Sequence, residues 1–191
     1  ALFLHIATFA AVCVVYRREV LALLKEIFSY IPNKISKRGS NDPETLRFLG
    51  LMIISLLPLF AVVPMKDKIE AAFDSPLTVG ISLAITALLL FFANRYGKGN
   101  KTVKEMTIWD ALVIGLFQMC AVLPGLSRSG ATIAAGLFCG LERKTAVKFS
   151  FIMSLPTILA AAFLEAIDLT AESVAAIAYG PYIVGFVAAA V

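Results

Sequence analysis

The sequence predicts an all-α fold, namely a polytopic bundle of transmembrane helices with one re-entrant helix–loop–helix hairpin. The first part rests on composition. Of the 191 residues, 60% are hydrophobic and 16% are charged, with a mean hydropathy of +0.88, whereas a soluble domain carries about 25% charged residues. The apolar residues also lie in long runs rather than in alternation, which favours helices in lipid over a β-barrel.

The expected membrane-crossing helices are apolar runs bounded by charged or polar segments. In chain order the runs are Ala1–Tyr16, Leu46–Val63, Leu77–Tyr96, Ala146–Leu164 and Tyr179–Val191. We expect Pro58 to interrupt the second run and Pro64 to end it. Because the first and last runs coincide with the two ends of the sequence, we expect 1–191 to be a single transmembrane domain that is incomplete at both ends.

The segments between the runs are polar and of three kinds. Glu19–Ile31 has charged residues on one side and apolar residues on the other at helical spacing, a pattern that suits a helix lying at the membrane interface. The polar loop Pro32–Pro43 follows it. Met65–Ser75 is a short charged connection. Gly97–Thr107 is basic and contains glycine, so we expect a loop.

The distribution of Lys and Arg predicts which segments are cytoplasmic. Residues 17–47 carry seven Lys or Arg, residues 95–107 carry four, and residues 142–148 carry three. Residues 65–75 carry two beside three acidic residues, and residues 165–173 carry none. By the positive-inside rule the first three segments are cytoplasmic and the other two face outward. Residues 108–141 therefore begin and end on the same face of the membrane.

Residues 108–141 are too few for two crossings, because each crossing needs about 20 residues. Ile108–Leu123 and Gly130–Leu141 are both shorter than that, and Pro124 and Gly125 separate them. We therefore expect two half-helices folded back on each other as a re-entrant hairpin over about 108–141. Irregular backbone at membrane depth occurs where protein or a water-filled cavity surrounds it, so the hairpin indicates a functional site.

The candidate site is Pro124–Thr132, which we call the anion site. Pro124 and Gly125 allow a sharp turn, and Ser127 or Ser129 can cap the second half-helix. Free N–H groups and the helix dipole favour an anion at this end, and the planar fork of Arg128 can bind two phosphate oxygens at once. Thr132 adds a further hydroxyl, and Gly130 and Ala131 leave the backbone accessible.

The energetic cost of Arg128 favours a functional role. An arginine at mid-membrane costs roughly 2.5–3.5 kcal/mol on insertion scales. The local sequence offers no carboxylate beside it, since Asp110 and Glu142 are placed near the two ends of the hairpin. An anion site is the simplest explanation.

Other interpretations of these residues stay open. Arg128 could instead extend to the interface if the loop is shallow. The hydroxyls of the anion site could satisfy the backbone of a broken helix; they belong to Ser127, Ser129 and Thr132. Gly136 and Gly140 are better explained by close helix packing than by ligand contact. For Gln118, an interhelical hydrogen bond is favoured over catalysis.

Two segments resemble a known family. Gly115–Thr132 (GLFQMCAVLPGLSRSGAT) and Glu142–Pro156 (ERKTAVKFSFIMSLP) closely resemble the undecaprenyl-diphosphate phosphatases of bacteria. Leu4–Thr8 and Tyr16–Glu19 are similar to the segment that follows the first motif of that family. The resemblance covers essentially the whole chain in order, and the PGxSRSxxT motif is specific.

The resemblance implies a hydrolase that converts undecaprenyl diphosphate to undecaprenyl phosphate and inorganic phosphate. Such an enzyme recycles the lipid carrier for peptidoglycan synthesis, with consequences for cell wall biogenesis, cell shape and antibiotic resistance. It implies a multi-pass protein of the bacterial inner membrane. Among the site residues, Arg128 would bind phosphate with Ser127 and Thr132 as catalytic partners. The substrate-binding residues would be Ser129, Gly125, Gly130 and Ala131.

The resemblance also implies parts that this sequence lacks. The family carries an acidic ExxxE motif leading into a Pro-Ser-Ser-Gly-His turn, which would precede Ala1; His5 is not its histidine, because no Ser-Ser-Gly precedes it. A divalent cation, Mg or Ca, is expected for the full-length protein, with its ligands outside these residues. We therefore expect the 191-residue piece alone to be inactive. The expected partners are undecaprenyl diphosphate and the lipid bilayer, with a homodimer as a possible assembly and no nucleic acid.

Two other functions share features with this sequence. A transporter of a lipid-linked phosphate or another anion would also use broken half-helices that point at the ligand. An acidic motif with a Ser-Gly-His turn upstream would favour the hydrolase over this alternative. Membrane lipid phosphatases with an SRxxxxxH motif are disfavoured, because no histidine follows Arg128 in the sequence.

Overall fold

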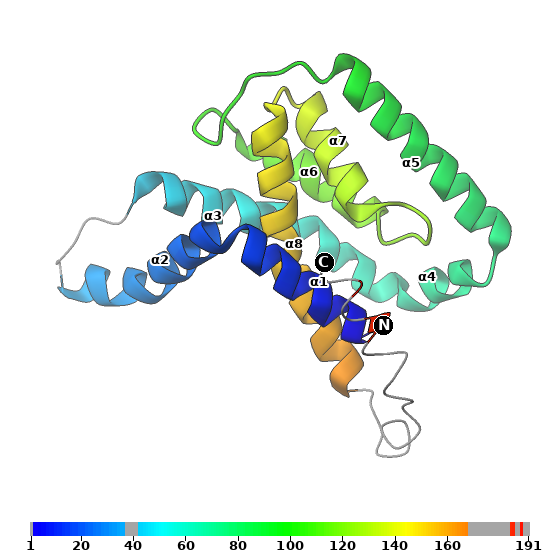
Figure 1. The fold of residues 1–191 in the computed structure, drawn as a ribbon, viewed down its shortest axis with the longest axis horizontal. Helices are drawn as coiled ribbons and strands as arrows, with labels where there is room; N and C mark the ends of the chain where they lie inside the picture. Colours follow the sequence, from blue (N-terminus) through cyan, green and yellow to red (C-terminus); the bar gives the residue numbers. More distant parts are fainter. Residues whose placement is uncertain (1, 37–41, 168–183, 186–187, 189–191) are drawn as a thin grey trace. The chain divides into compact units, whose positions relative to one another are not determined.

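The computed structural model describes residues 2–36, 42–167, 184–185 and 188. The regular elements found among these residues are helical, and the β structure found among them is one isolated bridge between Lys101 and Leu141. This confirms the predicted all-α fold (Figure 1). The elements are α1 (Leu2–Val15), α2 (Arg17–Ser36), α3 (Pro43–Leu56), the 3₁₀ helix η1 (Leu57–Met65), α4 (Lys66–Phe73), α5 (Pro76–Tyr96), α6 (Ile108–Cys120), α7 (Arg128–Phe138) and α8 (Arg143–Ile167).

The chain divides into two compact units. One is Leu23–Ser150, which contains the hairpin and every residue of the anion site. The other combines Ala1–Ala22 with Phe151–Val191, and in it the rings of Tyr16 and Phe151 stack with centroids 6.1 Å apart. The grouping of residues 1–191 into a single transmembrane domain stays a prediction.

Three stretches of the described residues are long and apolar enough to cross a membrane. They are Pro43–Met65, Pro76–Tyr96 and Arg143–Phe163, with mean hydropathies of 2.4, 2.2 and 1.7. They coincide with three of the five predicted runs, so the chain is a membrane protein. The first predicted run contains α1, whose 14 residues are fewer than a full crossing needs. The last run and the acidic segment 165–173 lie largely outside the residues whose side chains the structure describes.

The first long span changes its helical form at the predicted proline. Asp42 caps α3 by accepting hydrogen bonds from the N–H groups of Glu44 and Thr45, each at 3.3 Å. A hydrogen bond from the Thr45 hydroxyl, followed by these two, holds the pKa of Asp42 below its usual value. At Leu57 the α-helix gives way to η1, because Pro58 has no N–H to donate to the preceding turn. The predicted interruption is confirmed.

Two predicted connections are helical instead. The loop expected from Pro32 onward is wrong as far as Ser36, because α2 continues through the proline. An interior proline removes one backbone hydrogen bond at a cost of about 3 kcal/mol, but the following residues keep theirs. The charged connection Met65–Ser75 contains α4, whose Lys, Glu and Ala residues are strong helix formers.

The hairpin forms within the larger unit. Helices α6 and α7 pack against each other, and α7 also packs against α5 (Figure 1). A Cβ atom on Gly136 would lie 3.1 Å from the Cβ of Ala146, so this glycine brings α7 close to α8. The interpretation of Gly136 as a packing residue is confirmed.

The two ends of the hairpin meet at its base, which we define as residues 97–110 and 139–142. The N–H of Lys101 donates to the carbonyl of Gly140 at 3.0 Å, and the N–H of Glu142 donates to the carbonyl of Lys101 at 3.0 Å. Gly140 has a φ of 85°, a conformation that suits glycine after the end of a helix. Gly99 lies so close to the backbone of Gly140 that a Cβ atom would overlap it.

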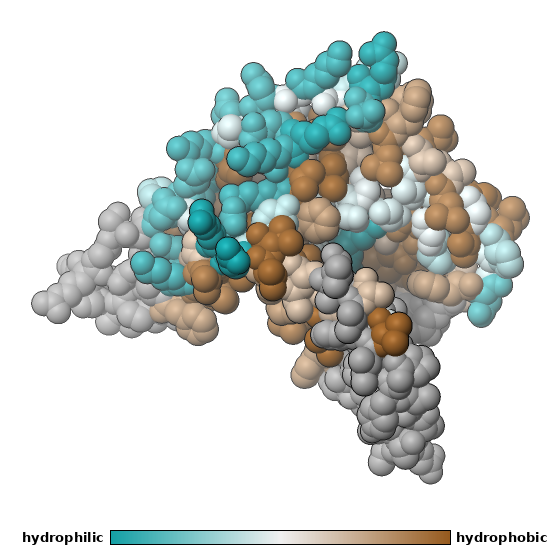
Figure 2. Space-filling view, in the orientation of Figure 1, coloured by the Kyte–Doolittle hydropathy of each residue, from teal (hydrophilic) through white to brown (hydrophobic). Residues whose placement is uncertain are grey.

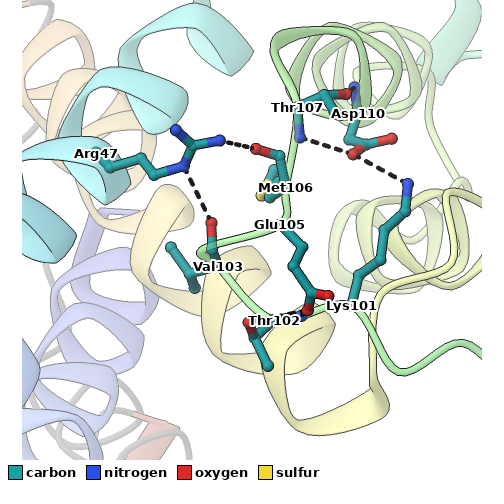
Figure 3. Close-up of polar contacts among 8 residues, drawn as sticks. All are labelled: Arg47, Lys101, Thr102, Val103, Glu105, Met106, Thr107 and Asp110. Carbon is teal, nitrogen blue, oxygen red and sulfur yellow. Dashed lines mark hydrogen bonds and ion pairs between the residues drawn. The ribbon is translucent and has the colours of Figure 1, made fainter.

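Side chains hold the base as well (Figure 3). Asp110 accepts hydrogen bonds from the backbone N–H of Thr107 at 2.8 Å and from the ammonium of Lys101 at 3.4 Å. Thr107 in turn caps α6 by accepting from the N–H of Asp110, which completes a capping box. From α3, Arg47 donates to the loop carbonyls of Val103 at 3.4 Å and Met106 at 2.7 Å.

On the surface of the larger unit, hydrophilic and large apolar residues are segregated, as expected for a protein in a membrane. Figure 2 shows hydrophilic residues gathered along the edge that carries the loop between α5 and α6. The exposed basic residues there are Arg95, Lys98, Lys104, Arg143 and Lys144. Most of the large apolar side chains of α5 are exposed instead, as expected for a helix that faces lipid.

Candidate functional site

The tip of the hairpin, residues 121–127, turns the chain sharply between α6 and α7. Pro124 is buried, and Gly125 has a φ of 84°, a value that glycine adopts without strain. A Cβ atom on Gly125 would lie 2.6 Å from the carbonyl oxygen of Val79 on α5. Gly125 is therefore needed both for the turn and for its close approach to α5. The structure assigns it to shaping the loop; contact with a substrate stays a prediction.

Ser127 is the cap of α7, which resolves the choice between Ser127 and Ser129. Its hydroxyl accepts a hydrogen bond from the N–H of Gly130 at 3.1 Å. Of the N–H groups in the first turn, that of Gly130 is therefore already used. Ala131 is similar, because its N–H donates to the carbonyl of Ser127 at 2.8 Å. These bonds fix the geometry of the helix end.

Thr86 of α5 holds the loop from outside the hairpin. Its hydroxyl accepts a hydrogen bond from the N–H of Ser127 at 3.1 Å and donates to the carbonyls of Ser82 at 3.0 Å and Gly125 at 3.4 Å. The sequence interpretation missed this residue. The available signal was a hydroxyl within a largely apolar span, a pattern that often marks an interhelical hydrogen bond.

Arg128 and Ser129 are the first two residues of α7. Arg128 is half-buried and Ser129 is exposed. The guanidinium charge therefore adds to the positive end of the helix dipole. Helix geometry leaves the N–H of Ser129 without an acceptor inside the helix. A loop that ends in a helix N-terminus with an arginine at its first position is suited to an anion with several oxygens.

Thr132, Gly130 and Ala131 face the protein interior rather than the surface. The hydroxyl of Thr132 donates to the carbonyls of Arg128 at 2.9 Å and Ser129 at 3.2 Å, and it also contacts the hydroxyl of Ser150 on α8. Thr132 and Ala131 are 2% and 1% exposed. The structure thus places Arg128 and the two serines at the helix end and the other three residues behind it.

Gln118 on α6 differs from the other buried polar residues. It is 1% exposed, and its side-chain nitrogen and oxygen have no hydrogen-bond partner among the described residues. The interpretation of Gln118 as an interhelical hydrogen-bonding residue is therefore wrong for this structure. A carboxamide of this kind is uncommon, because each buried polar atom without a partner costs about 1–3 kcal/mol.

The described residues give little support for a metal site within the hairpin. No group of three or more His, Cys, Asp or Glu side chains in the described part of the chain could hold a metal ion. Asp110, the buried carboxylate, belongs to the hairpin base and is already bonded to Thr107 and Lys101. No step of the chemistry is therefore assigned to a cation at these residues.

Comparison with known proteins identifies the family. Residues 1–191 match the family described as "Bacitracin resistance protein BacA". The chain is 38% identical over 168 residues to "Undecaprenyl-diphosphatase 1" of Shouchella clausii, a match that covers 87% of this chain and 59% of that protein. It is 40% identical over 164 residues to "Undecaprenyl-diphosphatase" of Methanococcus maripaludis strain C7, covering 85% of this chain and 61% of the relative.

A third relative matches along nearly the whole chain. It is "Undecaprenyl-diphosphatase" of Carboxydothermus hydrogenoformans, 36% identical over 187 residues, covering 97% of this chain and 66% of that protein. The chain thus spans roughly three fifths of the length of the first relatives, 59% and 61%. The match to the family over residues 1–191 and these identities show that the chain belongs to the BacA family.

Proposed function

We propose that the chain supplies the diphosphate-binding part of an enzyme that hydrolyses undecaprenyl diphosphate. The observation that carries the proposal is the position of Arg128 as the first residue of α7, directly after the capping residue Ser127. The relatives are named for this reaction, and their sequences match through this segment. The products would be undecaprenyl phosphate and inorganic phosphate.

The proposed roles follow from the positions of the side chains. Arg128 would bind two oxygens of the terminal phosphate and stabilise the charge that develops as the bond between the two phosphates breaks. The N–H and hydroxyl of Ser129 would donate to the same group, while Ser127 and Thr132 keep the helix end in place. Water would attack the terminal phosphorus, and the bridging oxygen would leave with the lipid phosphate.

The wider setting is also part of the proposal. A multi-pass protein in a bacterial inner membrane would meet its lipid substrate within the bilayer, and a homodimer is compatible with that setting. A divalent cation, Mg or Ca, would neutralise phosphate charge in the complete gene product. Its ligands would come from outside the residues described here, as the described carboxylates form no group that could hold it.

The test is a hydrolysis assay on the complete gene product, purified in detergent with undecaprenyl diphosphate as the substrate. We expect release of one inorganic phosphate per lipid and appearance of undecaprenyl phosphate. Adding a chelator should stop the release and adding Mg or Ca should restore it. No release by folded, cation-supplied protein would contradict the proposal. Movement of intact lipid diphosphate across proteoliposomes without release would favour the transporter instead.

A further inference from the structure

Ser150 on α8 makes a side-chain hydrogen bond to the first turns of α7. Its hydroxyl contacts the hydroxyl of Thr132, a residue 18 positions away in the sequence. Both residues are 2% exposed, so water does not compete for the contact. The consecutive helices α7 and α8 thus share a buried side-chain hydrogen bond, and it involves Thr132, the last residue of the anion site.

The direction of this hydrogen bond follows from the atoms around Thr132. Its hydroxyl carries one hydrogen and lies 2.9 Å from the carbonyl oxygen of Arg128 and 3.2 Å from that of Ser129. Carbonyl oxygens only accept, so the hydrogen of Thr132 points to them. Ser150 must then donate to the Thr132 oxygen. The result is a chain of donors from Ser150 through Thr132 to the carbonyl of Arg128.

We propose that Ser150 is a positioning residue for the anion site, acting through Thr132 on the backbone of Arg128. The proposal rests on the proposed function of that site. A hydroxyl that bonds a carbonyl one turn earlier tilts the peptide group and bends the helix locally. Ser150 fixes which way that hydroxyl points. It therefore controls the direction in which the Arg128 side chain leaves the helix.

Helix α5 holds the backbone next to Arg128 from the N-terminal side. The hydroxyl of Thr86 on α5 accepts from the N–H of Ser127, the residue directly before Arg128. The backbone around Arg128 is thus fixed on its N-terminal side by α5 and from behind by α8. An arginine held in this way loses little freedom when it binds phosphate, and displacement of a binding group by about 1 Å can cost 100-fold in rate.

Ser55 on α3 provides a matched control. It is 0% exposed, and its hydroxyl donates to the carbonyl of Leu51 in its own helix at 2.9 Å. Replacing either serine with alanine removes one buried hydroxyl of the same size. The Ser150 hydroxyl is bonded to Thr132 of the anion site, whereas the Ser55 hydroxyl is bonded within its own helix. A general effect of losing a buried hydroxyl would appear in both variants.

The experiment compares Ser150→Ala, Ser150→Thr and Ser55→Ala in the complete gene product. With undecaprenyl diphosphate we expect Ser150→Ala to lower kcat about tenfold, as one lost hydrogen bond predicts. KM should rise as well, because a displaced Arg128 also binds the ground-state diphosphate more weakly. Ser150→Thr keeps the hydroxyl and should restore most of the rate, and Ser55→Ala should match the wild type. Combined with Thr132→Val, Ser150→Ala should cause little further loss, because both remove the same donor chain.

A second measurement does not depend on turnover. Hydrogen exchange of the segment from Ser127 to Thr132 should speed up in Ser150→Ala, and inorganic pyrophosphate should bind about tenfold more weakly. Wild-type kcat and pyrophosphate affinity in Ser150→Ala would overturn the positioning role while leaving the proposed function intact. A wild type that binds pyrophosphate but releases no phosphate would overturn the proposed function, and Ser150 would then be judged by pyrophosphate affinity alone.

Discussion

The base and the tip of the hairpin differ in how completely their polar groups are bonded. At the base, backbone bonds join Lys101 to Gly140 and Glu142, and Asp110 bonds both Thr107 and Lys101. A second layer comes from Arg47, which occupies two loop carbonyls. The backbone and the buried carboxylate at this end of the hairpin are therefore bonded within the protein.

At the tip the bonds fix the backbone, while one buried side chain keeps its polar atoms without a partner among the described residues. Thr86 and the capping residue Ser127 hold the helix end, while Ser129 is exposed. Gln118 lies in the last turn of α6, and its amide has no partner among the described residues. Because α6 and α7 form a hairpin, this last turn and the first turn of α7 are at the same end.

We expect stability and function to depend on different ends of this one supersecondary unit. Satisfied polar groups stabilise a fold, while groups left without partners are most often found where a ligand or partner binds. We therefore expect substitutions at the base to change thermal stability with little direct effect on catalysis. Substitutions at the tip should do the reverse. Five predictions test this division.

The largest expected effect is that of Arg128→Lys at the tip. Lysine keeps the charge but cannot bind two phosphate oxygens with a planar fork, so we expect phosphate release to fall by about 100-fold or more. Thermal stability should change little. The measurement is kcat/KM with undecaprenyl diphosphate beside a melting curve in detergent. Near-normal turnover would indicate that Arg128 extends to the interface instead.

Arg47→Lys is the matched change at the base. Lysine cannot bond the carbonyls of Val103 and Met106 in the same geometry, so the free energy of unfolding should fall by about 1 kcal/mol. Phosphate release by the folded fraction should stay at the wild-type rate. If both arginine variants lose activity equally while folded, the division between base and tip is wrong.

The next effect is that of Gly99→Ala at the base. A Cβ atom at Gly99 would overlap the backbone of Gly140, and backbone atoms cannot move aside as a flexible side chain can. We expect a loss of stability of about 1–3 kcal/mol, seen as a lower melting temperature and lower folded yield. Gly80→Ala on α5 is the control, because a Cβ atom there meets nothing within 4 Å. An unchanged melting temperature in Gly99→Ala would show that the base is loosely packed.

A smaller effect, on activity rather than on stability, is expected for Gln118→Met at the tip. Methionine has a similar shape and removes two buried polar atoms that have no partner among the described residues, so thermal stability should stay the same or rise. Phosphate release should fall about tenfold, as for one lost hydrogen bond to a charged group. A lower melting temperature would instead show that the amide has a structural partner in the complete gene product.

Local sequence patterns were enough to predict the parts of the hairpin that depend on neighbouring residues. The apolar runs, Pro124 with Gly125 and the capping serine each act within a few positions. The structure confirms three of the five runs as long apolar helices, the turn at Gly125 and the serine cap. Contacts between distant segments were not predictable. Thr86 is 41 positions from Ser127, and Ser150 is 18 from Thr132. A hydroxyl in an apolar helix indicates that a hydrogen-bond partner exists without identifying it.

The smallest expected effect is a dependence of stability on pH at the base. The carboxylate of Glu105 accepts hydrogen bonds from the N–H of Thr102 at 2.9 Å and from its hydroxyl at 3.2 Å, and these bonds lower its pKa below the usual 4.5. A lowered pKa contributes stability above the unfolded value, and this contribution is lost as the pH falls through the folded value.

The melting temperature should therefore decrease on acidification below pH 4.5, and Glu105→Gln should reduce that decrease. The change should be small, because the carboxylate is exposed and screened by solvent. The tip offers a direct comparison, since residues 121–132 contain no Asp or Glu. Glu105→Gln should thus leave the pH profile of phosphate release unchanged. A shifted profile would mean that the base and the tip are coupled through α6, contrary to the division proposed here.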